Sequence, residues 1–303
     1  SLDVCARACA EQGDTVWIEN PGYGGALAAF RGAGLAVQGI EVDGDGMAPA
    51  ARDWTRRRPK VIYATPSHQY PLGVVLTLAR RMALIDGARS CGALIIEDDY
   101  DSEFRHEGPP LPAMQGLAVD APVLYCGTFS KTMFPGLRIG YVVVPPALAQ
   151  PFAAMRAHAS AAGRVAEQLA LADFLRNGEF ALHLRRMRRL YRQRRDALVE
   201  ALDRHLGRIA SVHGASAGMH LSLRLLDPRV SDGAIARQAR AQGIVVNPIS
   251  AHAIGADARS TWNGLMLGYA QVPAERMDEL VKRLAALVYL EAYRGSLPVR
   301  AQA

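Results

Sequence analysis

The chain has 303 residues, of which 50% are hydrophobic and 21% are charged, so it can hold two domains and has the composition of a soluble globular protein. It contains no apolar run close to the roughly 20 residues of a spanning helix and opens on no secretory signal, and its four cysteines form no CxxC pair; these features predict a cytoplasmic protein with free thiols. The formal net charge of +6 comes almost entirely from arginine, because Lys60, Lys131 and Lys282 are the only lysines.

Apolar segments alternate with amphipathic segments over roughly the first 148 residues. Apolar strands separated by helices favour an α/β fold, with a mostly parallel sheet flanked by helices. Sites in such sheets lie beyond the carboxyl ends of the strands. The predicted strands are 15–19, 35–42, 61–64, 93–97 and two within 123–144, and the predicted helices are 2–11, 22–31, 49–56 and 78–89.

The pattern changes after Pro145 and Pro146. A long helical region is predicted over 147–206, and beyond it short strands alternate with helices, which indicates a smaller α+β domain. We place the boundary near residue 148. The predicted strands of the second part are 220–225, 244–246 and 265–269, and its predicted helices are 232–242 and 273–287.

The helical region contains the arginine-rich run Arg185–Arg195. A solvated helix face with Met187, Leu190 and Tyr191 turned inward explains this run better than nucleic-acid binding does. The run has no aromatic interleaving on a sheet and no recognised DNA-binding motif.

The stretch Val123–Val144 has two apolar strands joined by a loop that carries Lys131 and, seven residues later, Arg138. A lysine between buried strands costs free energy unless it is paired, neutral or bonded to something. Lys60, in RRRPK, and Lys282, on an amphipathic helix, have surface patterns instead. The loop therefore predicts a bonded partner for Lys131.

The segment Ile95–Phe104 places five carboxylates directly after an apolar strand. A solvated acidic loop is the simplest interpretation. A calcium loop is excluded because neither the turn glycine nor the closing glutamate is present. A DxD-type metal site of a nucleotide-sugar enzyme would leave Lys131 and Arg138 unexplained. The histidines do not approach metal-ligand spacing, so no metal site is predicted; those considered are His68, His183, His213 and His220.

A fourth interpretation uses both loops. Asp98, Tyr100 and Lys131 would meet at adjacent strand ends, one helix-and-strand crossover apart, and together they suit pyridoxal phosphate. The lysine forms a Schiff base with the aldehyde, the aspartate keeps the ring nitrogen protonated, and the tyrosine donates to the ring phenolate oxygen. Two hydroxyls and a guanidinium can bind the phosphate, and these belong to Thr128, Ser130 and Arg138.

The motif SKTMFPGLRIGY resembles the lysine motif of fold-type I pyridoxal-phosphate aminotransferases. Together with IIEDDYDSEFR, TPSHQYPLG and HLRRMRRLYRQRRDAL, it resembles more specifically the aminotransferase-like domain of MocR-type GntR transcription regulators. The resemblance implies the cofactor roles above and adds Tyr23, in ENPGYGG, as the aromatic that stacks on the ring. For Tyr23 alone, a turn tyrosine packed on the sheet is the more ordinary explanation.

The resemblance also implies an organisation. Residues 1–148 would be the cofactor-binding large domain, and residues 149–303 the long linking helix and the small domain. A homodimer, a small amino compound as ligand and DNA contact through an N-terminal winged-helix domain absent from this chain are implied as well. The family's glycine-containing phosphate loop would precede the helix that starts near Leu2, and it is missing from the sequence.

Two positions depart from working aminotransferases. Tyr70 stands where those enzymes have an asparagine, and Met266 stands where an arginine would anchor the substrate carboxylate. These departures favour an effector domain that senses pyridoxal phosphate, an amino compound or both. The alternatives are a free-standing aminotransferase of amino acids, which the set Asp98, Tyr100 and Lys131 allows, and a nucleic-acid-binding protein that uses its arginine-rich helix.

Overall fold

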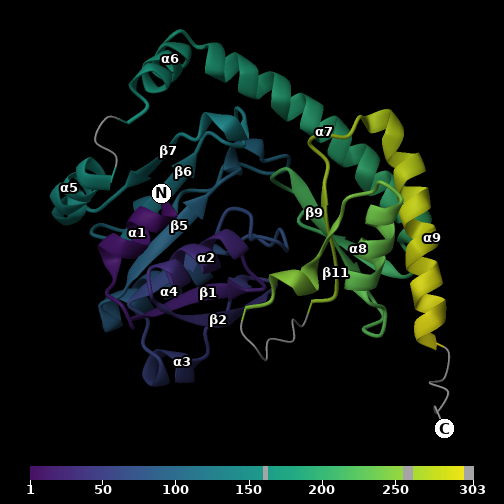
Figure 1. Ribbon diagram of the computed structural model, residues 1–303, viewed down its shortest axis with the longest axis horizontal. Helices are drawn as coiled ribbons and strands as arrows, with labels where there is room; N and C mark the ends of the chain where they lie inside the picture. The colour runs from purple at the N-terminus through teal and green to yellow at the C-terminus, as the bar shows by residue number, and fades with distance from the viewer. Residues whose placement is uncertain (160–162, 255–261, 297–303) are drawn as a thin grey trace.

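The computed structural model describes residues 1–159, 163–254 and 262–296 (Figure 1). A seven-stranded sheet with the order β3-β2-β1-β4-β5-β6-β7 forms its larger part. Five strands are parallel, and β3 and β7 run antiparallel to their neighbours at the two edges. The predicted α/β fold is confirmed. The strands are β1 Thr15–Asn20, β2 Ala36–Asp43, β3 Gly46–Met47, β4 Val61–Ala64, β5 Leu94–Asp99, β6 Val123–Thr128 and β7 Gly140–Val143.

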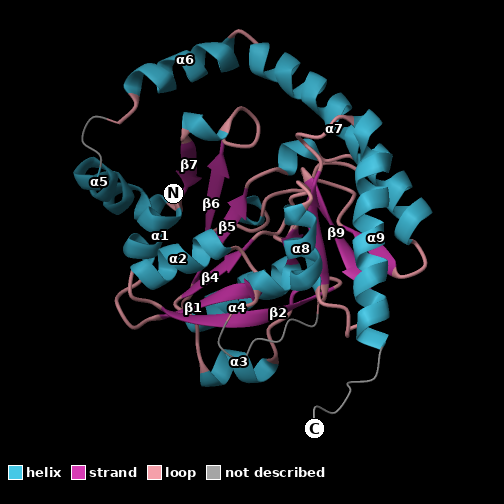
Figure 2. Ribbon diagram, turned by 45° about the vertical axis from the view of Figure 1, so that its right-hand side comes forward, coloured by secondary structure: helices cyan, strands magenta, loops and turns pink. Residues whose placement is uncertain are grey.

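Helices cover both faces of this sheet (Figure 2). In β1, Val16 and Ile18 face the cluster under α1 and α2, whereas Trp17 faces the opposite cluster under α4. Side chains on a strand alternate between faces, so a strand buried on both sides needs a continuous apolar run, which is the pattern in the sequence. The covering helices are α1 Leu2–Cys9, α2 Gly24–Gly32, α3 Ala51–Arg56 and α4 Leu78–Cys91.

The connection from β5 to β6 differs from the prediction. It contains the 3₁₀ helices η1 Ser102–Phe104 and η2 Met114–Gly116 and, between the two strands, no α-helix. The prolines of GPPLP, at 109–112, explain the difference, because proline removes a backbone donor and disrupts a helix interior. Asp98 and Lys131 are therefore linked by an irregular segment instead of a helical crossover.

The long helical region is three helices, α5 Ala149–Ala159, α6 Val165–Arg176 and α7 Glu179–Leu206. Gly178, in the left-handed conformation at φ 76°, separates α6 from α7. The helix α7 spans the molecule from the side of the large sheet to the small one (Figure 1). Tyr191 is buried in the core of the small part, and Met187 and Leu190 pack against it, which confirms the predicted inward face.

A four-stranded antiparallel sheet with the order β10-β11-β9-β8 forms the smaller part, backed by α8 Asp232–Ala241 and α9 Met277–Ser296. The predicted strand at 244–246 is wrong. Ile244 and Val246 are buried and Val245 is exposed, as in a strand, but only the next two residues pair with β11. The strand β8, which comes first along the chain in this part, was not predicted. The strands are β8 Ala210–His213, β9 His220–Leu225, β10 Asn247–Pro248 and β11 Gly264–Gly268.

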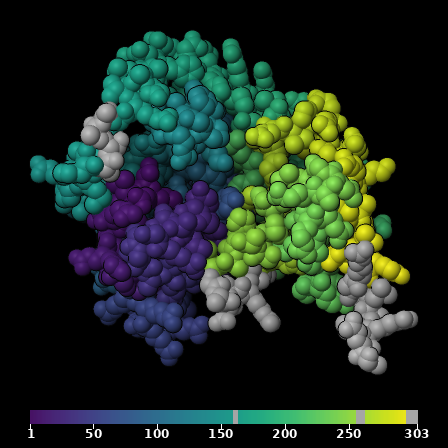
Figure 3. All heavy atoms as spheres, in the orientation of Figure 1, coloured from purple at the N-terminus to yellow at the C-terminus, as the bar shows by residue number. Residues whose placement is uncertain are grey.

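The two parts lie against each other (Figure 3). The Ser222 hydroxyl of β9 donates to the Pro71 carbonyl of the large part at 2.7 Å. Beside it the loops cross so closely that a Cβ on Gly73 would lie 2.5 Å from the Cα of Gly214. The boundary near residue 148 stays a prediction. In the described ranges no helix is long and apolar enough to cross a membrane.

Candidate cofactor site

Asp98 lies near the carboxyl end of β5 and is partly buried. Tyr63 is the third residue of the neighbouring strand β4. Its hydroxyl donates a hydrogen bond to Asp98 Oδ2 at 2.7 Å. Burial raises the pKa of Asp98 to about 6, and the hydrogen bond from Tyr63 opposes this shift. Burial, followed by the charge of Asp98, raises the pKa of Tyr63, which keeps the phenol a donor. The sequence analysis did not single out Tyr63, although it predicted the strand 61–64 on which this residue lies.

Tyr100 is partly buried beside Asp98. Its hydroxyl donates to the carbonyl of His68 at 2.7 Å, in the loop after β4. Burial, and then the neighbouring Asp101, raise its pKa well above the ordinary value. Tyr100 is therefore a neutral phenol whose proton is donated to the His68 carbonyl, and its role as a donor to a ring oxygen stays a prediction.

Tyr70 is the centre of an aromatic cluster at the site. Its ring makes edge contacts with Tyr23, Tyr100, His220 and His252, with centroids 5.2–6.2 Å apart. Tyr23 is 41% exposed and packs against Tyr70, so neither the stacking role nor the packing explanation of this residue is decided by its position. Its ring lies over Gly25, where a Cβ would come within 2.5 Å of it. This exposed face is available for stacking on a ligand.

The β6–β7 loop carries the predicted phosphate-binding groups. The Thr128 hydroxyl accepts a hydrogen bond from the Ser130 backbone N–H at 3.2 Å and lies 3.1 Å from the Ser130 hydroxyl. Arg138 follows a 3₁₀ turn in the left-handed conformation, at φ 52°, and is exposed. The loop thus brings two hydroxyls to one point and holds a guanidinium at its far end.

Lys131 is exposed in this loop. The desolvation cost expected from the sequence is therefore not imposed by the chain's own described residues. Its charge does reach the site, because it helps to lower the pKa of the buried His220. The register pairs Asp98 with Cys126 and Asp99 with Gly127, so the ends of β5 and β6 lie side by side as predicted. Within the described ranges, no hydrogen bond or ion pair joins Lys131 directly to Asp98 or Tyr100.

The acidic segment begins inside β5, which extends to Asp99, and is not a solvated loop, so that interpretation is wrong. Glu97 is buried and accepts the backbone N–H groups of Met114 and Gln115. Asp99 is also buried and accepts the hydroxyls of Ser102 and Tyr125. Through these hydrogen bonds Glu97 and Asp99, at the end of β5, hold the irregular β5–β6 connection in place.

A buried hydrogen-bond network adjoins the aromatic cluster through Tyr70, and the sequence analysis did not predict it. Glu19, near the end of β1, accepts the Thr65 hydroxyl at 2.6 Å, and Thr65 in turn accepts the Tyr70 N–H. Gln69 donates to the Pro21 and Tyr70 carbonyls. Burial raises the pKa of Glu19 to about 7. The network fixes the two loops that present Tyr23 and Tyr70.

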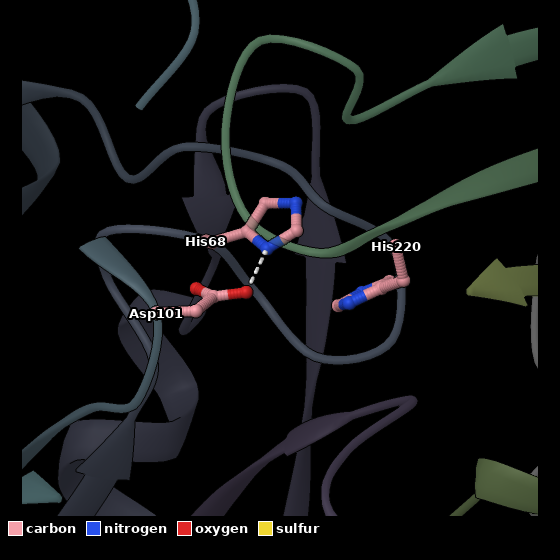
Figure 4. Close-up of side chains that lie close together, drawn as sticks. All are labelled: His68, Asp101 and His220. Carbon is pink, nitrogen blue, oxygen red and sulfur yellow. Dashed lines mark hydrogen bonds and ion pairs between the residues drawn. The ribbon is translucent and has the colours of Figure 1, made fainter. Parts of the chain in front are cut away.

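His68, Asp101 and His220 form a buried cluster at the junction of the two parts (Figure 4). His68 Nδ1 lies 3.1 Å from Asp101 Oδ2. His220 comes from β9, and burial lowers its pKa well below the ordinary value. Spacing along the sequence could not reveal this cluster, because the small sheet brings His220 to the other two residues.

The small sheet turns one face toward the site. Leu265 and Leu267 belong to its core, whereas Met266, between them, pairs with Ser222, the residue that contacts Pro71. Met266 is itself buried. Position 266 itself has no guanidinium, as the sequence suggested, but the face that holds His220 and Ser222 also carries Arg224, which lies over the ring of Trp262.

The aminotransferase class I and II family model matches residues 1–284, and the chain belongs to this family. Over 99% of its length it is 40% identical to the probable rhizopine catabolism regulatory protein MocR of Rhizobium meliloti, covering 59% of that protein. It is 36% identical over 90% of its length to the uncharacterised HTH-type regulator YhdI of Bacillus subtilis, covering 57%. The chain is thus an aminotransferase-like domain homologous to MocR/GntR-type regulators, and it spans under two thirds of them.

The solved structure of LysN, the α-aminoadipate aminotransferase of Thermus thermophilus, superposes with a TM-score of 0.86 at 28% identity, covering 97% of this chain and 75% of LysN. That structure holds N-(5'-phosphopyridoxyl)-L-leucine. The fold is therefore that of fold-type I aminotransferases.

The residues of this chain fit pyridoxal phosphate. A partly buried carboxylate, a neutral phenol and an exposed aromatic face surround one end of the sheet, and the neighbouring loop adds an amine, two hydroxyls and a guanidinium. Burial raises the pKa of Asp98, and a cationic partner would stabilise its charged form. A protonated ring nitrogen supplies such a partner.

Proposed function

We propose that this chain is the pyridoxal-phosphate-binding effector domain of a MocR-type transcription regulator, and that it senses the cofactor, an amino compound or both. The observation that carries the proposal is the placing of Asp98, held by Tyr63, beside the strand end that leads into the Lys131 loop. Similarity to MocR over almost the whole chain supports the regulatory role. DNA contact would come from a domain outside this chain. The protein would act in the cytoplasm.

Bound pyridoxal phosphate would supply an aldehyde for the amine and a ring that withdraws electrons from an attached amino compound. Lys131 would hold it covalently, and Asp98 would keep the ring nitrogen protonated. Tyr100 would donate to the ring oxygen, and Tyr23 would cover one face of the ring. The phosphate would lie among Thr128, Ser130 and Arg138, in charge-assisted hydrogen bonds.

The test of cofactor binding uses the three lysines. Purified chain mixed with pyridoxal phosphate is reduced with borohydride, and the labelled peptide is identified by mass spectrometry. We expect the label on Lys131, loss of the yellow colour in Lys131→Ala, and no change in Lys60→Ala or Lys282→Ala, which are matched controls. A colourless wild-type protein, or a label spread over all three lysines, would contradict the assignment.

A second candidate, a free-standing aminotransferase of amino acids, is supported by the complete set Asp98, Tyr100 and Lys131 and by the fold shared with LysN. Against it stands Met266, because a missing bidentate guanidinium weakens carboxylate binding by roughly 1.5–3 kcal/mol. Multiple-turnover transfer between an amino acid and a keto acid would favour the enzyme. A single half-reaction, or none, would favour the sensor.

We also propose a homodimer. The edge strand β7 exposes Tyr141 and Val143, each 42% exposed, and α6 exposes Leu169 at 58%. Phe129 contacts Tyr141, and Phe180 contacts both Phe129 and Phe174 of α6, so a run of aromatic contacts joins the two surfaces. An apolar edge strand invites a partner.

A further inference from the structure

The cluster of His68, Asp101 and His220 has the donor set of a transition-metal site. The three side chains are 1% to 7% exposed, and one nitrogen or oxygen of each lies within 4.8 Å of those of the other two. His68 and Asp101 come from loops after β4 and β5, and His220 reaches them from β9 (Figure 4). Two imidazoles and a carboxylate form a donor set that zinc-class ions accept.

Backbone carbonyls orient both imidazoles. His68 Nε2 lies 3.2 Å from the Gly214 carbonyl, and a proton there leaves the Nδ1 lone pair facing Asp101 Oδ2. Burial lowers the pKa of His220 and an interaction with the Pro71 carbonyl opposes this shift, while its Nε2 has no hydrogen-bond partner among the described residues. Metal-binding histidines almost always donate their second ring N–H to such an outer acceptor.

Two buried atoms of the cluster lack a partner. Asp101 Oδ1 and His220 Nε2 make no hydrogen bond in the described structure. A proton on His68 Nδ1 would satisfy only the contact with Asp101 Oδ2 and would leave both of these atoms unpaired. One cation between the three side chains would engage His220 Nε2 as well. Buried polar atoms without partners are rare enough to require an explanation.

Carboxylates around Asp101 also favour a cation, whereas the positive charge of Lys131, which adds to burial in lowering the pKa of His220, opposes one. Asp98 and Glu103 both feel the negative charge of Asp101, and Asp99 adds to it. The backbone of Gly218 packs directly on the pair of His68 and Asp101, where a Cβ would lie 2.2 Å from His68 Nδ1. The glycine thus admits close approach of the small part without a side chain over the cluster.

We propose that His68, Asp101 and His220 bind one divalent transition-metal ion of the zinc class, which links the large part of the molecule to the small one. Its residues are not the ones assigned to the cofactor, although His68 and His220 both contact Tyr100, so the two sites are neighbours.

The test uses untagged, cofactor-free protein, because a histidine tag and pyridoxal phosphate adducts both bind metals. The protein is stripped with a chelator and titrated with Zn²⁺ by calorimetry and with Co²⁺ by visible absorption. We expect one equivalent per chain and the d–d bands of a four-coordinate Co²⁺ site. Asp101→Asn and His220→Gln, which keep the side-chain volume, should weaken binding at least tenfold.

The matched control is His158→Ala, an exposed histidine on α5. It should bind like the wild type, and circular dichroism should show that all variants are folded. Absence of stoichiometric Zn²⁺ and Co²⁺ binding by the wild-type protein would overturn the proposal, whatever the variants do. Binding that survives both cluster substitutions would overturn it too.

Discussion

Asp98 shows how a residue proposed to bind a cofactor can oppose folding. Its pKa is raised from 3.8 to about 6 by burial, with Tyr63 as its hydrogen-bond donor. Between pH 3.8 and about pH 6, the Asp98 carboxyl is therefore mostly protonated in the folded state and mostly ionised in the unfolded state. The contribution of Asp98 to stability is full below about pH 3.8 and is lost as the pH rises to about 6. Above that pH, the cofactor-free protein carries the cost of a buried carboxylate.

Replacement of Asp98 by Asn should remove this cost. The amide oxygen can still accept from Tyr63 but does not titrate. Without cofactor, we expect Asp98→Asn to be more stable than the wild type by about 1–3 kcal/mol at pH 7.5, with the difference shrinking toward pH 4.5. Urea unfolding at the two pH values measures this difference.

The same variant should bind pyridoxal phosphate more weakly, because the ring nitrogen loses its anionic partner. Asp86→Asn, at an exposed carboxylate on α4, is the control and should change neither property. Equal stability of Asp98→Asn and the wild type at every pH would show that the carboxylate is not desolvated.

At the scale of elements, α7 explains the arginine-rich run. Arg188 and Arg192 donate to the carbonyls of Glu103 and His106, and Arg194 donates to that of Ala270. These bonds fix the helix to the β5–β6 connection and to the end of β11. Several guanidiniums are therefore engaged within the chain, which supports a structural role for the run over a nucleic-acid surface.

Arg195 gives the sharpest test of this role. Its side chain is 10% exposed and forms ion pairs with Glu107 and Asp196, which are themselves largely exposed. Because the acids can be solvated once the guanidinium is gone, we expect Arg195→Met to destabilise by about 1–2 kcal/mol, less than the loss of a fully buried pair. Thermal unfolding measures it.

Arg189→Met is the control on the same helix, because Arg189 is exposed and has no hydrogen bond or ion pair within the described ranges. It should stay within about 0.5 kcal/mol of the wild type. Equal effects of the two substitutions would mean that the ion pairs of Arg195 add nothing to stability.

The same scale shows what the sequence could predict. The side chains of neighbouring residues such as Ile95 and Ile96 pack on opposite faces of the sheet. A strand covered by helices on both faces therefore has a short run of consecutive apolar residues in the sequence. Parallel strand ends meet at one edge, which made the proximity of Asp98 and the Lys131 loop predictable. β10 was misplaced because its pairing depends on where β11 lies. The contacts of His220 were out of reach because they require the packing of one part on the other.

At the scale of the whole molecule, the apolar surface on β7 and α6 predicts the assembly. Val143 and Leu169 are exposed on elements that the aromatic residues 129, 174 and 180 join. A charged side chain buried in such a contact would lose its hydration without gaining a partner. We therefore expect the wild-type chain to be a dimer by light scattering, and Val143→Glu and Leu169→Glu to be folded monomers at micromolar concentration.

Val119→Glu is the control, since Val119 is 86% exposed in the loop that precedes β6 and belongs to neither β7 nor α6. It should remain dimeric. Because the loop that carries Lys131 and Arg138 leads directly into β7, the monomeric variants should also bind pyridoxal phosphate more weakly than the control does. A wild-type chain that stays monomeric at high concentration would contradict the proposed assembly. Monomeric variants with unchanged cofactor affinity would show that dimerisation and the cofactor site are independent.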